Sequence, residues 1–307
     1  MKLLTFALKE NEPQVGFLLD KQIVDIAACR ALLPKSLLPE KITMKALLEP
    51  IVLEELMWLR ERLLKMKATA FLDFEKATKG ALYEVEEVQI KAPLYDPQKI
   101  ICLGRNYAEH AKEGGAEVPK TPMIWGKFSS AIIGHKEAII LPKISKKVDV
   151  EIELVIVIGK EGKHIPEEKA FEYIAGFTIG NDVSARDYQY IDKQFTRAKT
   201  MDTFCPLGPW IVTKEEIPAP QNLNIELQVN GKTWQKSNTS KMIFSIPYIV
   251  SYLSHSFTFQ PGDLIFTGTP SGVGHYQKPP VYLKEGDIVT LTIEGIGTLE
   301  NPVRSEE

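Results

Sequence analysis

Residues 149–159 read DVEIELVIVIG, two glutamates followed by a run of apolar, mostly β-branched side chains. In a β-strand, residues two apart point to the same face, so Glu151 and Glu153 project side by side. The apolar run predicts a strand that enters the core. Two adjacent carboxylates there repel each other unless a positive charge lies between them. A hard divalent cation such as Mg²⁺, which takes oxygen ligands, is one explanation, and an edge strand with a solvated acidic rim is the other.

A third carboxylate follows a second predicted strand, GFTIGN at 176–181. Asp182 ends this strand, and Ser184 is placed to cap the helix expected next. Three protein oxygens on one side of a cation leave the opposite positions for water and a chelating substrate. An aspartate here is equally common as a turn or capping residue.

The segment GRNYAEHAKEGG, residues 104–115, contains a candidate acid–base pair. His110 and Glu113 are three residues apart and share one face of a helix, so Glu113 can orient His110 or share its proton. Gly114 and Gly115 end this helix and suit the hinge of a lid. An exposed polar helix without a catalytic role has the same spacing.

Two further segments can serve an anionic ligand. Lys199, in QFTRAKTMDTF at 194–204, would offset the charge of a carboxylate-rich site. The glycine-rich segment 261–274 lacks the P-loop and dinucleotide-binding spacings, but can present backbone N–H groups and Thr269 to a carboxylate. The histidines form no zinc-binding spacing, and no Gly-x-Ser-x-Gly motif is present.

The composition excludes several classes of protein. The 307 residues include 37 Lys+Arg and 40 Asp+Glu, a net charge of −3, so no basic surface for nucleic acid or anionic membranes is expected. No apolar run approaches the ~20 residues of a membrane span, and the first residues do not resemble a secretory signal. The three cysteines lie far apart without a CxxC pair, which predicts a reduced, cytoplasmic protein.

The chain divides at KAPLYDP, residues 91–97, where two prolines favour an extended connector. We expect a small N-terminal α/β accessory domain over residues 1–92, with short strands and a long helix at 50–67. The catalytic domain, 93–307, shows no regular alternation of strands and helices, which predicts an α+β fold with mostly antiparallel strands. Its predicted strands are 99–103, 151–158, 209–212, 224–229, 264–266 and 288–293, and its predicted helices are 106–113, 166–174, 185–195 and 243–254.

Taken together, these segments resemble the fumarylacetoacetate hydrolase family, over roughly residues 95 to 300. The matching blocks, in the family's order, are GRNY with His110 and Glu113, the Glu151/Glu153 strand, NDVSARD at 181–187, residues 199–208 and TGTPSGVG at 267–274. The N-terminal part is similar to the accessory domain of the longer bacterial members. The resemblance implies a mixed β-roll, usually dimeric, so we expect a homodimer.

The resemblance also implies roles for individual residues. Mg²⁺ or Mn²⁺ would be held by Glu151, Glu153 and Asp182. His110 and Glu113 would form the catalytic dyad of a lid. Lys199 would complete the catalytic set. Substrate or metal-bound water would be contacted by Arg105, Arg186, Gln189 and Thr269.

The activity implied is metal-dependent hydrolysis of a C–C bond in a small anionic 2,4-dioxo acid, such as an acylpyruvate, through a stabilised enolate. The same enolate stabilisation serves oxaloacetate decarboxylation, keto–enol tautomerisation or isomerisation of a hydroxymuconate-like diacid. These reactions share their electrostatics, so the sequence leaves them as alternatives.

Overall fold

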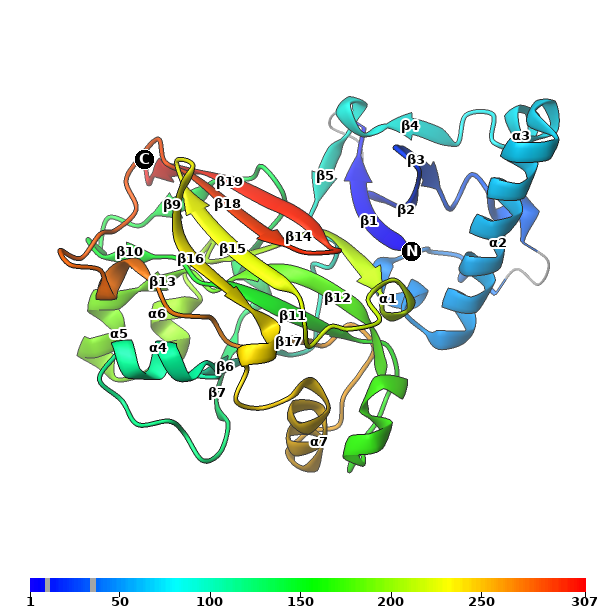
Figure 1. The fold of residues 1–307 in the computed structure, drawn as a ribbon. Helices are drawn as coiled ribbons and strands as arrows, with labels where there is room; N and C mark the ends of the chain where they lie inside the picture. Colours follow the sequence, from blue (N-terminus) through cyan, green and yellow to red (C-terminus); the bar gives the residue numbers. More distant parts are fainter. Residues whose placement is uncertain (9–11, 34–36) are drawn as a thin grey trace.

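The centre of the protein is an open mixed sheet, seen in a computed structural model that describes residues 1–8, 12–33 and 37–307 (Figure 1). Neighbouring strands are antiparallel, except that β17 (Leu264–Phe266) runs parallel to β6 (Ile100–Gly104) and β8 (Ile132–Ile133) runs parallel to β14 (Cys205–Thr213). Two short strands join at the side: β5 (Gln89–Lys91) pairs with β1, and β8 (Ile132–Ile133) pairs with β14. In spatial order the strands are β4 (Leu82–Glu84), β3 (Gln22–Asp25), β2 (Gln14–Leu19), β1 (Lys2–Ala7), β14 (Cys205–Thr213), β12 (Ile174–Asn181), β11 (Ile152–Ile158), β17 (Leu264–Phe266), β6 (Ile100–Gly104) and β7 (Met123–Lys127).

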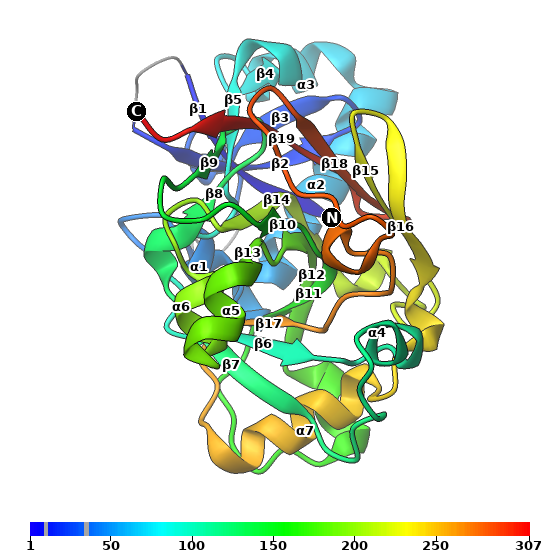
Figure 2. The same ribbon diagram turned by 90° about the vertical axis from the view of Figure 1, so that its left-hand side faces the viewer.

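A second sheet packs beside the central one (Figures 1 and 2). Its strands are, in order, β16 (Lys232–Asn238), β15 (Asn224–Val229), β18 (Ile288–Ile293), β19 (Gly297–Ser305) and β9 (Ile139–Leu141). A separate short pair consists of β10 (Val148–Asp149) and β13 (Ser184–Ala185). No closed barrel forms within the described part of the chain, and the α+β class with mostly antiparallel strands is confirmed.

Strand β11 separates two hydrophobic cores, because its alternate residues point to opposite faces. Leu154 and Ile156 pack in the core that contains residues of the second sheet, such as Leu227. Val155 and Val157 pack in the core formed with the N-terminal residues. The strand is therefore buried on both faces, as its apolar run predicts, and residues 151 and 153 lie on the face of Val155.

The N-terminal strands belong to the same sheet as the catalytic strands. β1 pairs with β14 in the register Lys2↔Val212 and Leu3↔Ile211, so hydrogen bonds cross the expected domain boundary at residue 92. The long N-terminal helix is α2 (Pro50–Thr69), which is close to the predicted 50–67. It is flanked by α1 (Met44–Leu47) and α3 (Phe71–Ala77). The division into residues 1–92 and 93–307 stays a prediction.

None of the four helices predicted for residues 93–307 has its predicted bounds. Those predicted at 106–113 and 243–254 begin two and three residues later, and the other two differ more. Residues 166–174 form a 3₁₀ helix, η4 (Glu167–Glu172), instead of an α-helix. The predicted helix 185–195 ends early because Lys193 has a left-handed backbone with φ of 52°. The α-helices of this part are α4 (Ala108–Glu113), α5 (Arg186–Asp192), α6 (Phe195–Lys199) and α7 (Ile246–Ser256). The other 3₁₀ helices are η1 (Arg30–Leu32), η2 (Val85–Glu87), η3 (Ser129–Ala131), η5 (Lys214–Glu216), η6 (Thr239–Lys241) and η7 (Gly274–Tyr276).

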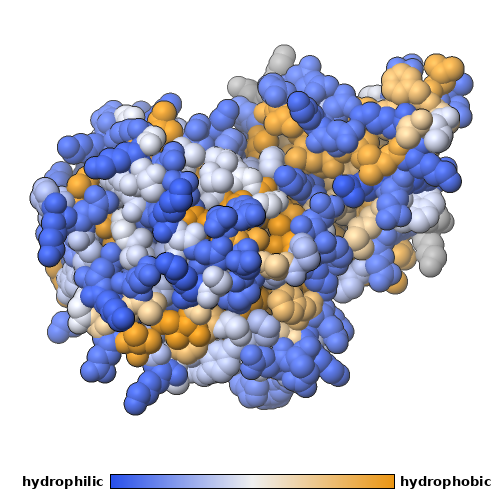
Figure 3. Space-filling model, viewed as in Figure 1, coloured by the Kyte–Doolittle hydropathy of each residue, from blue (hydrophilic) through white to orange (hydrophobic). Residues whose placement is uncertain are grey.

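Helices α4 and α5 lie at the opposite end of the molecule from α2 and α3 (Figure 1). Apolar residues are visible on the surface at the α3 end, where Phe71 and Leu72 are exposed (Figure 3). Among the described residues, no helix combines the length and apolar character that crossing a membrane requires.

Candidate active site

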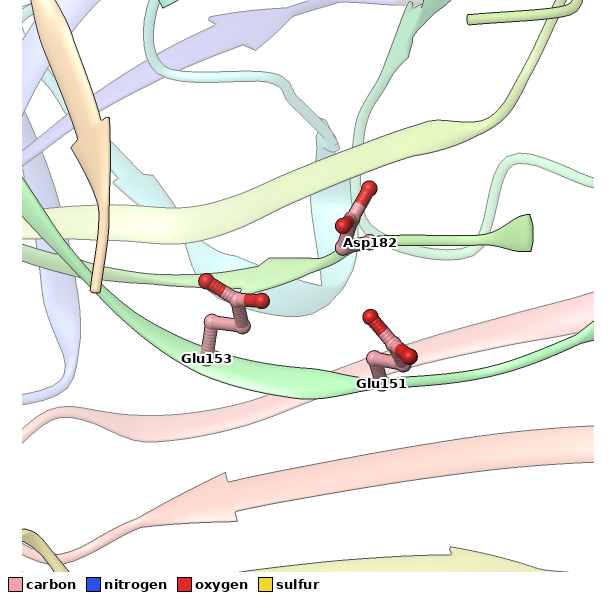
Figure 4. A group of neighbouring side chains, drawn as sticks. All are labelled: Glu151, Glu153 and Asp182. Atoms are coloured by element: carbon pink, nitrogen blue, oxygen red, sulfur yellow. The ribbon is translucent and has the colours of Figure 1, made fainter. Parts of the chain in front are cut away.

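Two neighbouring strands bring the three predicted carboxylates together (Figure 4). Glu151 directly precedes β11, Glu153 lies within it, and Asp182 directly follows β12. The antiparallel register pairs Ile152 with Asn181, and the Asp182 N–H donates to the Glu151 carbonyl over 2.9 Å. One oxygen from each carboxylate lies within 4.8 Å of the others, and all three side chains are buried.

Buried cations neutralise two of these carboxylates. Lys199 Nζ donates to Glu151 Oε2 over 2.7 Å and to Asp182 Oδ2 over 2.5 Å. Lys127 Nζ donates to Asp182 Oδ1 over 2.6 Å, and Arg186 Nη2 donates to Glu151 Oε1 over 2.6 Å. Burial by itself would raise the pKa of Glu151, but the charges of Lys199 and Arg186 outweigh it and hold this pKa well below its usual value. Glu151 is therefore ionised.

Glu153 has no such partner. Its Oε2 accepts one hydrogen bond, from Gly268 N over 2.7 Å, and no Lys or Arg of the described residues forms an ion pair with it. Burial raises its pKa well above the usual value, and the neighbouring Asp182 and Glu151 raise it further. Glu153 is therefore the one carboxylate of the trio that no cation of the described residues neutralises, and its surroundings disfavour its ionised form.

A divalent cation fits this set of donors. The carboxylate oxygens are hard ligands of the type that Mg²⁺ and Mn²⁺ prefer, and a dication would balance the charge of Glu153. Glu151, Glu153 and Asp182 are the residues that would hold it.

The His110–Glu113 pair forms on α4 as the spacing suggests. His110 Nδ1 lies 2.8 Å from Glu113 Oε1. A carboxylate at this distance accepts, so Nδ1 carries the proton and Nε2 is left free to take one. Glu113 Oε2 also accepts from Gly272 N over 2.9 Å, which fastens α4 to the glycine-rich segment 267–274.

This glycine-rich segment is held tightly against β11. Thr269 Oγ1 donates to the Ile152 carbonyl over 2.9 Å and accepts from Gln235 Nε2 over 2.7 Å. The hydroxyl of Thr269 therefore holds the loop in place, in addition to lining the site. Gly272 has φ of 104°, and a Cβ there would lie 2.1 Å from the Trp234 carbonyl oxygen, so only glycine fits.

The remaining predicted contacts differ in what they touch. Arg186 lies beneath the site, where its Nε donates to Asp149 Oδ2 over 2.9 Å and its Nη1 to Gln189 Oε1 over 3.1 Å. Arg105 is exposed, at a left-handed position with φ of 56° between β6 and α4. Every predicted site residue except Glu113 and Asp182 lines one cavity of about 340 Å³.

The sequence analysis missed several residues of this site. Asp149 accepts from Arg186 and from the backbone N–H groups of Gly274 and His275. Its signal was present, since it continues the alternation of Glu151 and Glu153 by one step. Lys127 is a single lysine on β7 without any local signal. The cavity walls also include Trp125, and Lys199 Nζ lies over its ring, 4.9 Å from the ring centroid.

The fold and the site together define an enzyme with a buried carboxylate centre of the kind that binds a divalent cation. The family model described as Fumarylacetoacetate (FAA) hydrolase C-terminal matches residues 99–304, and the chain belongs to the fumarylacetoacetate hydrolase family. The family expected from the sequence blocks is thereby confirmed.

Relatives of this chain have several activities. "Oxaloacetate tautomerase Fahd2a, mitochondrial" of Rattus norvegicus is 50% identical over 218 residues, which cover 71% of this chain and 70% of the relative. A solved 5-carboxymethyl-2-hydroxymuconate delta-isomerase from Mycobacterium smegmatis is 35% identical with a TM-score of 0.73, and all of both chains is covered. Maleylpyruvate hydrolase from Sphingobium sp. SYK-6, solved with manganese(II) and pyruvate, is 28% identical with a TM-score of 0.76 over all of both chains.

Proposed function

We propose that this protein is a divalent-metal-dependent tautomerase that interconverts the keto and enol forms of a 2-oxo dicarboxylate of the oxaloacetate type. The observation that carries the proposal is the proximity of a buried carboxylate trio, in which Glu153 has no cationic partner among the described residues, to a histidine whose Nε2 is free. Sequence analysis alone favoured C–C hydrolysis. We place tautomerisation before hydrolysis because the rat relative, which is 50% identical over 218 residues, is named an oxaloacetate tautomerase.

The residues divide the work as follows. His110, oriented by Glu113, takes a proton from C3 of the keto acid and returns it to the oxygen on C2, so one C–H bond is exchanged for one O–H bond and His110 is neutral again. A cation on the trio would stabilise the negative charge that develops on the substrate oxygen. Lys199, Lys127 and Arg186 pair with Glu151 and Asp182 and favour their ionised forms.

A second candidate is hydrolysis of the C3–C4 bond of an acylpyruvate. The apolar part of the cavity favours it, because Met123, Trp125 and Phe195 offer a wall against which an acyl group can pack. Here His110 would deprotonate a water that attacks C4, the C3–C4 bond would break, and C3 would gain a proton.

Product analysis separates these reactions. The protein is loaded with Mg²⁺ or Mn²⁺, or stripped with EDTA, and offered oxaloacetate and a series of acylpyruvates. We expect metal-dependent acceleration of the keto–enol exchange of oxaloacetate, followed by its ultraviolet absorbance, with nuclear magnetic resonance showing no more pyruvate than in a control with the same metal and no protein. Pyruvate from oxaloacetate would indicate decarboxylation, and a carboxylic acid from an acylpyruvate would indicate hydrolysis. Failure of the metal-loaded protein to accelerate the exchange would contradict the proposal.

Two expectations about the protein in the cell accompany this proposal. A homodimer is tested by size-exclusion chromatography with light scattering. The expected cytoplasmic location is tested by cell fractionation. The test is informative because the name of the rat relative includes the word mitochondrial.

A further inference from the structure

The cations of the cavity fall into two groups that differ in whether a carboxylate neutralises them. Lys199 and Arg186 line the cavity floor, and both are buried in ion pairs with the acidic residues there. The protein's own carboxylates neutralise the charge of both residues. These two cations therefore stabilise the ionised carboxylates of the expected metal site, and they are not available to bind a distant charged group of the substrate.

The second group consists of Arg105 and Lys193, which line the same cavity and are both exposed. Neither forms an ion pair with any residue whose side chain the structure describes. We call these two residues the cationic rim.

The backbone holds both rim residues in defined positions. Arg105 and Lys193 each adopt a left-handed conformation, with φ of 56° and 52°. Lys193 is the residue at which α5 ends, and α6, which carries Lys199, begins two residues later. A left-handed backbone is uncommon for a residue other than glycine, and it fixes the direction that the chain takes at each rim position.

We propose that Lys193, together with Arg105, binds the second carboxylate of the substrate and makes the enzyme select dianionic over monoanionic 2-oxo acids. This inference rests on the proposed function, in which the 2-oxo acid end lies at the carboxylate trio. A substrate anchored there extends along the walls formed by Trp125 and Phe195, which cannot balance a charge. A carboxylate at the far end meets compensating charge at the cationic rim.

A matched pair of ligands isolates the second carboxylate. 2-Oxoglutarate and 2-oxopentanoate have the same five-carbon chain and the same 2-oxo acid end, and differ in a distal carboxylate against a methyl group. Their affinities for the Mn²⁺-loaded protein are measured by calorimetric titration, which needs no turnover. We expect Lys193→Ala to lower the affinity for 2-oxoglutarate about fivefold, which is the size of effect that loss of a partly exposed charge pair has. The affinity for 2-oxopentanoate should change less than twofold.

Further variants separate a charge contact from a structural role. Lys193→Arg should retain the preference for the dianion, and Lys193→Glu should reverse it. Lys232→Ala, an equal change of net charge on an exposed strand end away from the cavity, should have no effect. Added NaCl should weaken 2-oxoglutarate binding more steeply in the wild-type protein than in Lys193→Ala.

The outcomes distinguish this inference from the proposed function. Equal weakening of both ligands, or no change in either, overturns the role of Lys193, and so does absence of dianion binding to the wild-type protein. A selective loss of 2-oxoglutarate in a protein without tautomerase activity would support the cationic rim and contradict the proposed reaction.

Discussion

Glu151 and Glu153 lie two residues apart on the same face of one strand, yet their surroundings differ. Glu151 accepts from Lys199 and Arg186, so its charge is balanced without a metal. Glu153 accepts only from a backbone N–H among the described residues. Replacing the two glutamates should therefore affect the metal-free protein in different ways.

We expect Glu151→Gln to lower the free energy of unfolding of the metal-free protein by about 3 kcal/mol, because it leaves Lys199 and Arg186 buried with less compensation. Glu153→Gln should leave this free energy unchanged or raise it, since the surroundings of Glu153 disfavour a charge and glutamine carries none. Urea unfolding in EDTA measures both. Calorimetric titration with Mn²⁺ should show at least a tenfold loss of affinity in each variant. Equal destabilisation by the two substitutions would contradict the assignment of the unbalanced charge to Glu153.

His110 is expected to act in proton transfer and not in holding the metal. His110→Ala should lower kcat by about 10²- to 10⁴-fold, the usual contribution of a general base, with Mn²⁺ affinity changed less than about threefold. Steady-state kinetics and metal titration test the two statements separately. His255→Ala is the control, because His255 is exposed at the end of α7 and should leave kcat unchanged. A parallel loss of metal affinity in His110→Ala would make His110 a ligand instead.

Hydrogen bonds between the α4 region and the segment 267–274 set the position of His110. Glu113 accepts from Gly272 N, and Asn106 Nδ2 donates to the Thr267 carbonyl over 2.8 Å just before α4. Helix α4 is thus tied at both ends to the loop whose Gly268 N donates to Glu153. Displacement of this loop should disturb the base and the metal site together.

Gly272→Ala tests this coupling. The added methyl meets the Trp234 carbonyl oxygen at a backbone conformation that alanine avoids, so the loop must shift. We expect a loss of about 2 kcal/mol in the free energy of unfolding and at least a tenfold loss of kcat/KM. Gly231→Ala is the matched control: its φ of 74° carries similar backbone strain, but a Cβ there has no neighbour within 4 Å. Gly231→Ala should cost stability alone, and an unchanged kcat/KM in Gly272→Ala would contradict the coupling.

The N-terminal part and the catalytic part share one sheet and one hydrophobic core. Leu3, Phe17 and Leu56 pack in the same core as Val155 and Phe266. The helices α2 and α3 nevertheless lie at the end of the molecule away from α4 and α5 (Figure 1). The N-terminal residues can therefore influence the site through the stability of β11, and not by touching the substrate.

Deletion of residues 1–92 should leave a fragment that does not fold. The deletion uncovers the edge of β14 and the face of β11 that carries Val155 and Val157, an apolar surface of the kind that aggregates. We expect the fragment 93–307 to be insoluble or to lack a near-ultraviolet circular dichroism signal. Co-expression with residues 1–92 as a separate chain should restore both. A soluble, active fragment 93–307 would instead establish it as an independent domain.

Much of the fold was predictable because its signals are local. The apolar run that ends at residue 158 identified a strand that enters the core, and the strands at 224–229, 264–266 and 288–293 were predicted with the bounds that the structure has. The helix predicted at 185–195 was wrong beyond residue 192, because the left-handed backbone of Lys193 has no signature in a lysine. The 3₁₀ geometry of η4 likewise depends on its surroundings.

The order of amino acids alone was sufficient to bring Glu151 and Glu153 to one face and to pair His110 with Glu113, since strand and helix periods set those relations. Only the tertiary structure decided which charges are balanced. Lys127 reaches Asp182 from another strand, and Arg186 joins Asp149 to Glu151. No described cation pairs with Glu153, and this also could not be predicted from the sequence. The physical reason is that contacts between distant segments depend on sheet register and packing, which no local pattern encodes.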